Sequence, residues 1–432
     1  MERLPGFRDF YPEPLPHQDV WSADARQFIF EKWRAIARRY GFREYDGPPL
    51  EPLELFTTKS GAEIVGQLYN FVDKGERAVS LRPEMTPTLA RMVGARAQAL
   101  KKPIRWFAIP QLFRYERQQR GRLREHFQLN MDLIGEAGPL ADAELMAAAV
   151  DVVRAFGFGP EAVRLRVSDR RVLRALLEGG GLAPDSLPLA YAVIDKSERD
   201  PREALEARLE KGGLGERERD VVFRVGALRG RDAVAAALKA AGGEQAGEPL
   251  ATALDALGAM GLGEFVDVDL TIVRGLAYYT GIVFELFAHG AARAVCGGGR
   301  YDGLLKALGG VDLPALGFGM GDVVLGDLLR ARAAALPRPG ALDAFLVAVS
   351  GEDVPPVLKL AHELRDRGLA IEYGLRQSGV RKQLELAAAR GAPRAVIVGP
   401  EERRVDAVLV RNLAAGTEER VPLSTLADLV AR

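Results

Sequence analysis

The sequence predicts an α+β fold in which a strand-rich domain, interrupted by helices, is followed by an α/β domain. Three observations predict this arrangement. Strand-like runs separated by hairpin turns fill much of residues 42–167 and return after Phe265. Charged helical patterns replace them between about 184 and 261. Beyond residue 341, short apolar strands alternate with helices, which favours a mainly parallel sheet covered by helices on both faces.

These patterns divide the 432 residues into a first domain at 1–332, a linker at 333–341 and a second domain at 342–432. The first domain contains a helical insertion at about 184–261, whose charges are expected to lie on solvated helix faces, with contact to tRNA or another partner as the alternative. A chain of this length can form two or three domains with substantial cores.

Composition limits the classes of function. The 59 basic residues are balanced by 59 acidic ones, so a nucleic acid would have to be bound by local basic patches. Cys296 is the single cysteine and the four histidines are scattered, so neither a disulfide framework nor a protein-bound metal is expected. The N-terminus carries charges and prolines, and no apolar run reaches the roughly 18–20 residues of a membrane span. We therefore expect a soluble, cytoplasmic protein.

The first domain opens with a helix, because apolar residues recur at steps of three or four over residues 21–40. Gly41 stands where a glycine would end that helix. Residues 42–52 predict a short strand closed by two prolines. A hairpin follows at 71–86, and a helix at about 87–100.

The domain is organised around a hairpin at residues 103–135, whose connecting loop is strongly basic. Its returning strand alternates polar with apolar residues, so one sheet face is polar and the other apolar. A single strand of this kind would favour a solvated face. Three such segments instead favour the floor of a binding site. Their polar residues are Arg82, Glu84 and Thr86, then Arg114, Glu116, Gln128, Asn130 and Asp132, and finally Arg274 with Tyr278 and Tyr279.

The remaining segments of the first domain predict a helix at 141–156 and a strand followed by a helix at 163–177. After Phe265, residues 294–308 and 315–329 each read as a strand and a glycine turn that lead into a helix. Gly297–Gly299 match neither glycine pattern of nucleotide-binding loops. These glycines alone give little support to a phosphate-binding loop, and they favour at least as strongly a tight turn, where the backbone closely approaches another group.

The side chains of the predicted site indicate that it binds both anionic and cationic ligand groups. Guanidinium groups present forked donors that suit phosphate oxygens, and Arg114 and Arg274 are the strongest candidates. Glu84 and Asp132 could hold an ammonium or imidazolium group. Such a combination suits the joining of an amino acid to a nucleotide.

Several motifs resemble those of class II aminoacyl-tRNA synthetases. FRYER with the basic loop and EHFQLNMDLIG resembles motif 2, GFREYDGPPLEP resembles motif 1, and ALGFGMG resembles motif 3. LRPEMT, QLNMD, RGLAYYTG and CGGGRYDGL are together similar to the histidyl-tRNA synthetase family, and the resemblance covers nearly the whole chain. It implies an antiparallel-sheet catalytic domain with a helical insertion, an anticodon-binding domain and a homodimer. The implied reaction joins L-histidine to ATP, which brings Mg²⁺, and then transfers histidine to the 3′ end of histidine tRNA.

The resemblance also implies residue roles. Glu84 and Thr86 would contact the amino end of histidine, Gln128 its carboxylate, and Asp132 with Tyr278 and Tyr279 its imidazole. Arg114 and Arg274 would flank the α-phosphate and also contact the amino acid, so that Arg114, Gln128 and Arg274 form the catalytic set. Glu116, Arg122, His126 and Phe127 would join Arg114 in binding ATP, and Arg376, Arg381 and Lys382 would contact tRNA phosphates.

Some residues depart from the family pattern. Motif 3 usually continues Gly-x-Glu-Arg, with the arginine stacking on adenine, whereas Asp322 and Val323 stand here. Asp132 replaces a glutamate, Ala277 an aspartate, and His126–Phe127 reverses an aromatic–histidine pair, so which ring covers adenine stays open. A minority branch of the family is similar in these respects.

Two other functions compete with the enzyme. The first is a histidine-sensing regulatory subunit of ATP phosphoribosyltransferase, which would lack the anticodon-binding domain and Arg274-type residues. The second is a tRNA-binding scaffold on the same fold. The presence of an α/β domain after residue 341 and of Arg114, Gln128 and Arg274 favours the enzyme.

Overall fold

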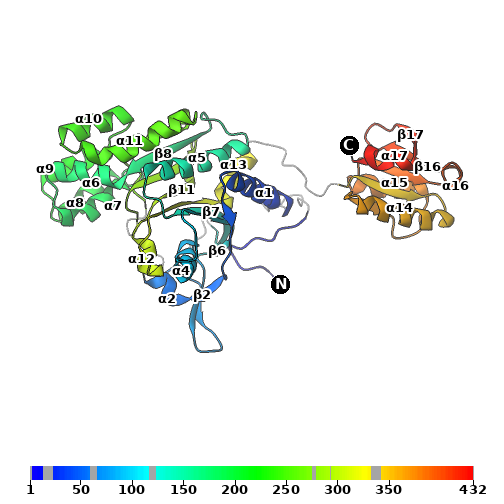
Figure 1. The fold of residues 1–432 in the computed structure, drawn as a ribbon, viewed down its shortest axis with the longest axis horizontal. Coiled ribbons are helices and arrows are strands. Elements are labelled where there is room, and N and C mark those ends of the chain that lie inside the picture. The colour runs from blue at the N-terminus through cyan, green and yellow to red at the C-terminus, as the bar shows by residue number, and fades with distance from the viewer. Residues whose placement is uncertain are drawn as a thin grey trace. The chain divides into compact units, whose positions relative to one another are not determined.

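The computed structural model describes residues 2–12, 23–58, 66–115, 123–274, 279–291, 293–331 and 342–431. The chain forms two compact units, which divide between Ala335 and Leu336 (Figure 1). The predicted linker at 333–341 lies outside the described residues. None of the helices in the described ranges combines the length and apolar character needed to cross a bilayer.

The first unit is built on a large sheet, as the alternating segments predicted. Its strands run in the order β1-β5-β7-β12-β11-β10-β8-β9 in the described part of the chain, with β6 also paired to β7. All neighbours are antiparallel except the outer pairs β1–β5 and β8–β9. The strands are β1 (Arg43–Glu44), β5 (Ile104–Ala108), β6 (Gln111–Phe113), β7 (Glu125–Ile134), β8 (Val163–Asp169), β9 (Val266–Val268), β10 (Ile282–Ala288), β11 (Ala294–Arg300) and β12 (Ala315–Gly321).

Helices bury the apolar face of this sheet. Leu129, Met131 and Leu133 of β7 are fully buried, whereas the alternate residues face the site described below. Helix α5 packs against β7, β10, β11 and β12, and α1 packs on α5. Helices α6 and α13 also contact the sheet, whereas α12 packs on the helix at Thr86–Arg96. The bounds are α1 (Ala23–Arg39), α5 (Pro139–Ala155), α6 (Arg170–Gly179), α12 (Leu304–Gly309) and α13 (Asp322–Ala331).

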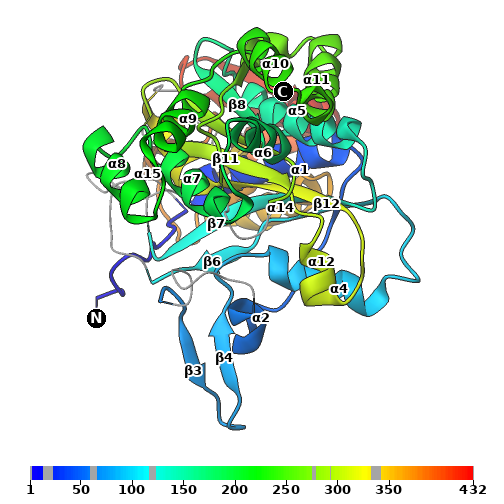
Figure 2. The ribbon, with the colours of Figure 1, turned by 90° about the vertical axis from the view of Figure 1, so that its left-hand side faces the viewer.

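A second, small sheet modifies two predictions. The strand predicted at 42–52 is two strands in different sheets, because the chain leaves β1 before its prolines and re-forms as β2 (Leu50–Pro52). The hairpin β3 (Asn70–Val72) and β4 (Ala78–Leu81) pairs with β2 and extends away from the large sheet, with α2 (Leu53–Thr57) beside it (Figure 2).

The prediction that Arg82, Glu84 and Thr86 share one face of a strand is wrong. Strand β4 ends at Leu81, Pro83 interrupts the chain, and α4 (Thr86–Arg96) begins at Thr86. The Arg82 guanidinium turns back to the carbonyl oxygen of Gly47 at 2.7 Å. Glu84 and Thr86 nevertheless reach the site, from a loop and a helix start.

The insertion is helical, as predicted. Two short 3₁₀ turns, at Pro184–Ser186 and Gly263–Phe265, flank its helices. These helices are α7 (Leu187–Ile194), α8 (Arg202–Lys211), α9 (Glu216–Gly226), α10 (Arg231–Ala240) and α11 (Glu244–Ala259).

The second unit contains a mixed sheet in the order β14-β13-β15-β16-β17. The prediction of a mainly parallel sheet is half right, since β14, β13 and β15 are parallel but β16 and β17 are antiparallel. Only the short α16 separates β15 from β16, too little chain for a parallel crossover. Helices cover both faces, as predicted. The elements are β13 (Ala344–Ala348), α14 (Val354–Asp366), β14 (Ile371–Tyr373), α15 (Val380–Ala389), β15 (Arg394–Val398), α16 (Pro400–Arg404), β16 (Ala407–Asn412), β17 (Glu418–Pro422) and α17 (Leu423–Val430).

Candidate active site

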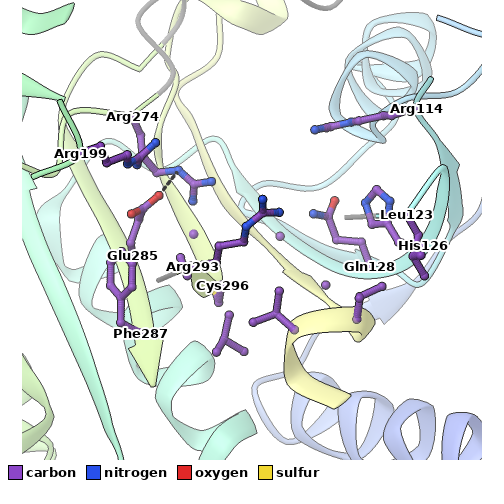
Figure 3. A pocket seen from close by; sticks show the side chains of 17 residues that line it. Arg114, Leu123, His126, Gln128, Arg199, Arg274, Glu285, Phe287, Arg293 and Cys296 are labelled. Atoms are coloured by element: carbon purple, nitrogen blue, oxygen red, sulfur yellow. Dashed lines mark ion pairs between the residues drawn. The ribbon is translucent and has the colours of Figure 1, made fainter. Parts of the chain in front are cut away.

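Two cavities adjoin on the polar side of the large sheet. The larger has a volume of about 420 Å³ and the smaller of about 110 Å³. Arg114, Gln128 and Arg274 line both cavities, together with Gly297 and Gly319. Figure 3 shows Arg114 and Gln128 on one side of the larger cavity and Arg274 on the other. The three residues predicted to form the catalytic set therefore lie where the cavities meet.

The floor of the small cavity is the polar face of β7, as its alternation predicted. Gln128, Asn130 and Asp132 line it along one strand face. Glu84 and Thr86 complete it from the α4 side, with Tyr279 and Tyr301 from the segments flanking β10 and β11. This cavity offers two carboxylates and two phenols to a ligand.

Asp132 is the most deeply placed charged group of the small cavity. Burial raises the pKa of its carboxyl to about 7, while a hydrogen bond donated by the Tyr301 hydroxyl opposes that rise. The pKa of the Glu84 carboxyl is also raised by burial, against the opposing effect of the Arg114 charge. An imidazole in this cavity would meet an acceptor that ionises near neutral pH.

Glycines in two neighbouring strands leave space for these side chains. A Cβ atom on Gly297 would lie 1.1 Å from Nη1 of Arg274. On Gly317 it would lie 2.1 Å from Oδ1 of Asp132, and on Gly319 2.7 Å from Nε2 of Gln128. The tight turn predicted at Gly297–Gly299 is wrong, because these residues form the middle of β11. The close approach expected there is real, and the approaching group is the Arg274 guanidinium.

Two contacts orient the shared arginines. Nε of Arg274 lies 3.1 Å from Oε1 of Glu285 on β10, and Nε of Arg114 donates to the carbonyl oxygen of Pro83 at 2.9 Å. Arg274 has a φ of 37°, a left-handed conformation that costs free energy in a residue other than glycine. Strain of this kind is concentrated at functional sites.

The structure separates His126 from Phe127. His126 lines the large cavity, and burial lowers its pKa to about 3, with Arg114 and Arg8 adding to that effect. Phe127 points to the opposite face, where its ring centroid lies 5.1 Å from that of Phe30. The prediction that Phe127 binds ATP is therefore not supported by its position, because strand alternation directs it away from both cavities.

Comparison with known proteins decides the family. A family model described as histidyl-tRNA synthetase matches residues 16–321, and one described as an anticodon binding domain matches residues 343–432. The histidine–tRNA ligase of Opitutus terrae is 44% identical, over 99% of this chain and 98% of the relative. That of Natronomonas pharaonis is 39% identical, over 98% of this chain and 96% of the relative. The chain belongs to the histidyl-tRNA synthetase family.

Solved structures agree in fold. The histidyl-tRNA synthetase of Nostoc sp. PCC 7120 superposes with a TM-score of 0.83 at 23% identity, covering 100% of this chain and 99% of that one. The apo enzyme of S. aureus gives 0.70 at 24% identity, with 100% of both chains covered. The predicted fold class is confirmed by these matches and by the family models. The predicted histidine–tRNA ligase function is confirmed by the full-length relatives and the family models.

The residues that follow the segment resembling motif 3 make different contacts in the structure. Asp322 accepts a hydrogen bond from the Phe127 backbone N–H at 2.9 Å and pairs with Arg8 at 2.9 Å. Burial raises the pKa of Asp322 to about 6, against the effect of Arg8. Val323 and Val324 form an apolar part of the large cavity. Asp322 thus anchors the N-terminal segment to β7, whereas Val323 and Val324 present apolar side chains to the cavity.

Several residues that line the cavities were not predicted from the sequence, among them Tyr301, Arg293 and Arg199. Tyr301 could have been found, since alternation from Gly297 through Gly299 places it on the same face as the cavity. Arg293 lies beside β11 and carried no pattern of its own. Arg199 comes from the insertion, whose charges were interpreted as solvated.

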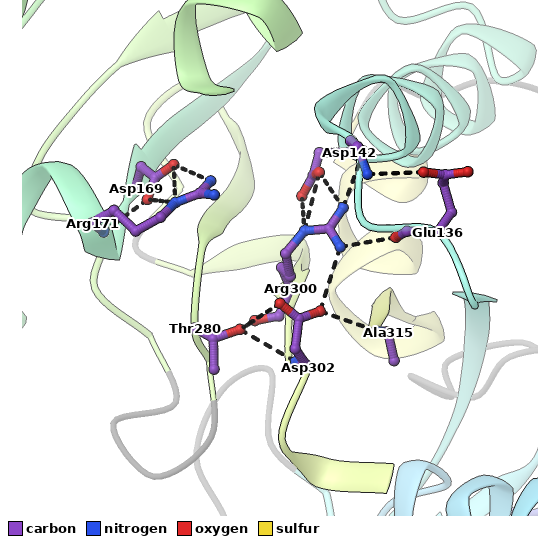
Figure 4. A network of polar contacts seen from close by, with 9 residues as sticks. Glu136, Asp142, Asp169, Arg171, Thr280, Arg300, Asp302 and Ala315 are labelled. Atoms are coloured by element: carbon purple, nitrogen blue, oxygen red, sulfur yellow. Dashed lines mark hydrogen bonds and ion pairs between the residues drawn. The ribbon is translucent and has the colours of Figure 1, made fainter. Parts of the chain in front are cut away.

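A buried ion pair holds Arg300, the residue before Tyr301, in place. Nη2 of Arg300 lies 2.5 Å from Oδ2 of Asp142 on α5, and Nη1 donates to the Glu136 carbonyl oxygen at 2.9 Å. Figure 4 shows this contact together with Asp302, which accepts from the Ala315 backbone N–H at 3.1 Å. Arg300 thereby fixes the end of β11 against α5.

The remaining predicted site residues belong to the second unit or lie outside the described ranges. Glu116, Arg122 and Tyr278 lie outside the described residues. Arg376, Arg381 and Lys382 are exposed in the second unit, where Nε of Arg381 donates to Glu385 at 3.0 Å. Within the described ranges, no group of three or more His, Cys, Asp or Glu side chains is arranged to hold a metal ion.

Proposed function

We propose that the chain forms histidyl-adenylate at the junction of the two cavities, with Arg114, Gln128 and Arg274 as the catalytic set. The observation that carries this proposal is that all three residues line both cavities. Histidine bound in the small cavity and ATP bound in the large one would bring a carboxylate and an α-phosphate together there. Positioning of the two reactants is then the main source of rate.

The chemical step uses the substrate's own carboxylate as the nucleophile. One carboxylate oxygen bonds to the α-phosphorus, and the bond from that phosphorus to the bridging oxygen breaks, so pyrophosphate leaves with the electron pair. Arg114 and Arg274 stabilise the charge on the non-bridging oxygens. A ribose hydroxyl at the 3′ end of the tRNA then attacks the activated carbonyl carbon, and AMP leaves.

We assign recognition of the histidine imidazole to Asp132 and Tyr279, with Tyr278, and of its amino group to Glu84 and Thr86. Asp132→Asn tests this assignment, because the amide keeps the shape but loses the charge. We expect the KM for histidine to rise at least about 100-fold, as for loss of a charge-assisted hydrogen bond in a buried site. Wild-type KM should fall as pH rises from about 6 to about 8, since the pKa of Asp132 is about 7 and only the ionised carboxylate can accept from both the Tyr301 hydroxyl and an imidazole N–H.

Stability distinguishes this result from misfolding. The pKa of Asp132 is raised on folding, so its stabilising contribution is complete below the unfolded pKa and is lost as pH rises through about 7. The asparagine variant should therefore melt at the same temperature as wild type, or higher, above that pH. A lower Tm there with unchanged histidine KM would contradict the role.

For ATP we assign Arg114, Glu116, Arg122 and His126, and we leave Phe127 out. His126 with its lowered pKa is a neutral ring suited to stacking, and Val323 and Val324 add apolar contact. A neutral ring and two valines in this cavity support the proposal that the chain belongs to the minority branch of the family, in which motif 3 is altered. Mg²⁺ would enter as part of the ATP substrate; Glu285 is the one carboxylate among the described residues of the large cavity.

The domain roles follow from the family. We propose residues 1–332 as the catalytic domain with the insertion at about 184–261, 333–341 as the linker and 342–432 as the anticodon-binding domain. A homodimer acting in the cytoplasm is part of the proposal.

Arg376, Arg381 and Lys382 are proposed to contact tRNA phosphates. Changing Arg381 and Lys382 together to alanine should weaken tRNA binding and reduce the slope of log K against log salt by about 1–2, because each phosphate contact releases counterions. Pyrophosphate exchange, which needs no tRNA, should stay at the wild-type level. An unchanged salt slope would remove these residues from the interface.

Aminoacylation tests the proposed function. Radiolabelled histidine should be transferred to a histidine tRNA transcript in the presence of ATP and Mg²⁺, and other tRNAs should remain uncharged. Histidine binding without charging, in a folded full-length protein, would favour the histidine-sensor alternative.

A further inference from the structure

One side chain of the large cavity comes from the helical insertion. Arg199 lies in the connection between α7 and α8, yet it lines the cavity with Arg274 and Glu285. It is the only residue of 184–261 among the described lining residues. Figure 3 shows Arg199 beside Arg274, across the cavity from His126.

Local hydrogen bonds fix the backbone that carries Arg199. Its N–H donates to the Lys196 carbonyl oxygen at 2.9 Å, and the next residue, Asp200, donates to the same oxygen at 2.9 Å. The Ser197 hydroxyl donates to the Ile194 carbonyl oxygen at 2.7 Å. The connection is a wound turn that presents the arginine from a defined position.

The residue before Arg199 attaches this turn to the catalytic sheet. Glu198 accepts hydrogen bonds from Nη1 of Arg166 at 2.9 and 3.1 Å and lies 3.6 Å from Nη2 of Arg229. Asp269 closes the ring of charges, at 3.0 Å from Arg229 and 3.5 Å from Arg166. We call Arg166, Glu198, Arg229 and Asp269 the insertion latch.

The latch continues to the cavity wall. The Arg166 guanidinium lies 4.9 Å from the ring centroid of Phe287, which lines the large cavity. Asp269 is buried and accepts from the backbone N–H and hydroxyl of Thr271 at 2.9 and 2.6 Å. The insertion is therefore fixed to β8 and β10 at the point where Arg199 enters.

The charge of the cavity fits a polyphosphate. Arg114, Arg199, Arg274 and Arg293 line it against one carboxylate, Glu285, in a chain whose 59 basic residues equal its 59 acidic ones. Arg199 lines the large cavity but not the small one. In an in-line displacement the leaving group departs on the side opposite the attacking oxygen, away from the histidine cavity.

We propose that Arg199 binds the pyrophosphate part of ATP, and that the insertion latch positions it. This inference rests on the adenylate chemistry proposed above. The latch makes Glu198 a positioning residue, because it holds the turn without lining the cavity. ATP binding and the placement of the insertion are then coupled through one turn.

The test is histidine-dependent ATP–pyrophosphate exchange by the full-length protein, with ATP and pyrophosphate each varied. Arg199→Ala should raise both KM values about tenfold or more and leave the histidine KM within about twofold. Arg199→Lys, which keeps charge without the fork, should be intermediate. Arg208→Ala removes an exposed arginine of α8 and should behave as wild type.

Glu198→Gln provides the test of positioning. It should raise the ATP KM about threefold in the wild-type background and have no further effect when Arg199 is alanine, since it acts through that residue. Equal effects in both backgrounds would overturn the positioning role.

Calorimetric binding of inorganic pyrophosphate gives a readout that does not depend on turnover. Arg199→Ala should weaken it about tenfold. The inference is overturned if this variant binds pyrophosphate and ATP as wild type does while wild type exchanges normally. It is also overturned if the variant loses only transfer to tRNA, which would assign Arg199 to the tRNA 3′ end. Absence of exchange in wild type would instead contradict the proposed function.

Discussion

Replacing Arg274 by alanine is expected to lower histidine-dependent ATP–pyrophosphate exchange by about 10²–10³-fold in kcat, the effect of removing one preorganised charge-stabilising donor. The guanidinium is held by Glu285 at 3.1 Å and enters both cavities. Because its role is largest when charge develops at phosphorus, histidine KM should change less than kcat.

The matched control is Arg293→Ala, which removes an arginine that lines only the large cavity. It should alter ATP KM more than kcat. A wild-type kcat in Arg274→Ala would exclude this residue from stabilisation of the transition state.

The second large effect is expected from the smallest substitution, Gly297→Ala. The added methyl group would lie 1.1 Å from Nη1 of Arg274, so either the guanidinium or β11 must move. We expect a loss of about 10²-fold in exchange, because a displacement of about 1 Å is enough to disturb a positioned catalytic group.

A double mutant shows whether this loss acts through Arg274. Gly297→Ala should cost little when Arg274 is already alanine, since coupled residues are not additive. Gly303→Ala is the control, because beyond its chain neighbours nothing lies within 4 Å of the place a methyl group would take there. Equal losses in both backgrounds would show that the methyl group damages the strand itself, and a lowered Tm would accompany them.

The floor of the site could be predicted because strand alternation is local. The period of two along β7 placed Gln128, Asn130 and Asp132 on one face. The same alternation places His126 on the cavity face and Phe127 on the opposite face. Alternation along β11 would also have found Tyr301.

The remainder depends on tertiary contacts that no local pattern records. Because glycine weakens strands, the sequence predicts that Gly297 belongs to a turn. In the structure Gly297 lies within β11, where a side chain would collide with the Arg274 guanidinium. The sequence predicts that Arg199 is a solvated charge. In the structure, the contact of Glu198 with Arg166 fixes the insertion to β8 and brings Arg199 to the cavity. Strand β4 is shorter than predicted because it ends before Pro83, yet Glu84 still lines the small cavity.

Adenylate formation is tested most directly by ATP–pyrophosphate exchange with the full-length wild-type protein, Mg²⁺ and each amino acid in turn. We expect exchange with histidine alone, because Asp132 in the small cavity would bind the imidazole and Gln128 would lie beside the carboxylate of histidine. Saturable histidine binding without exchange, in a folded protein, would contradict the assignment of Arg114, Gln128 and Arg274 to adenylate formation.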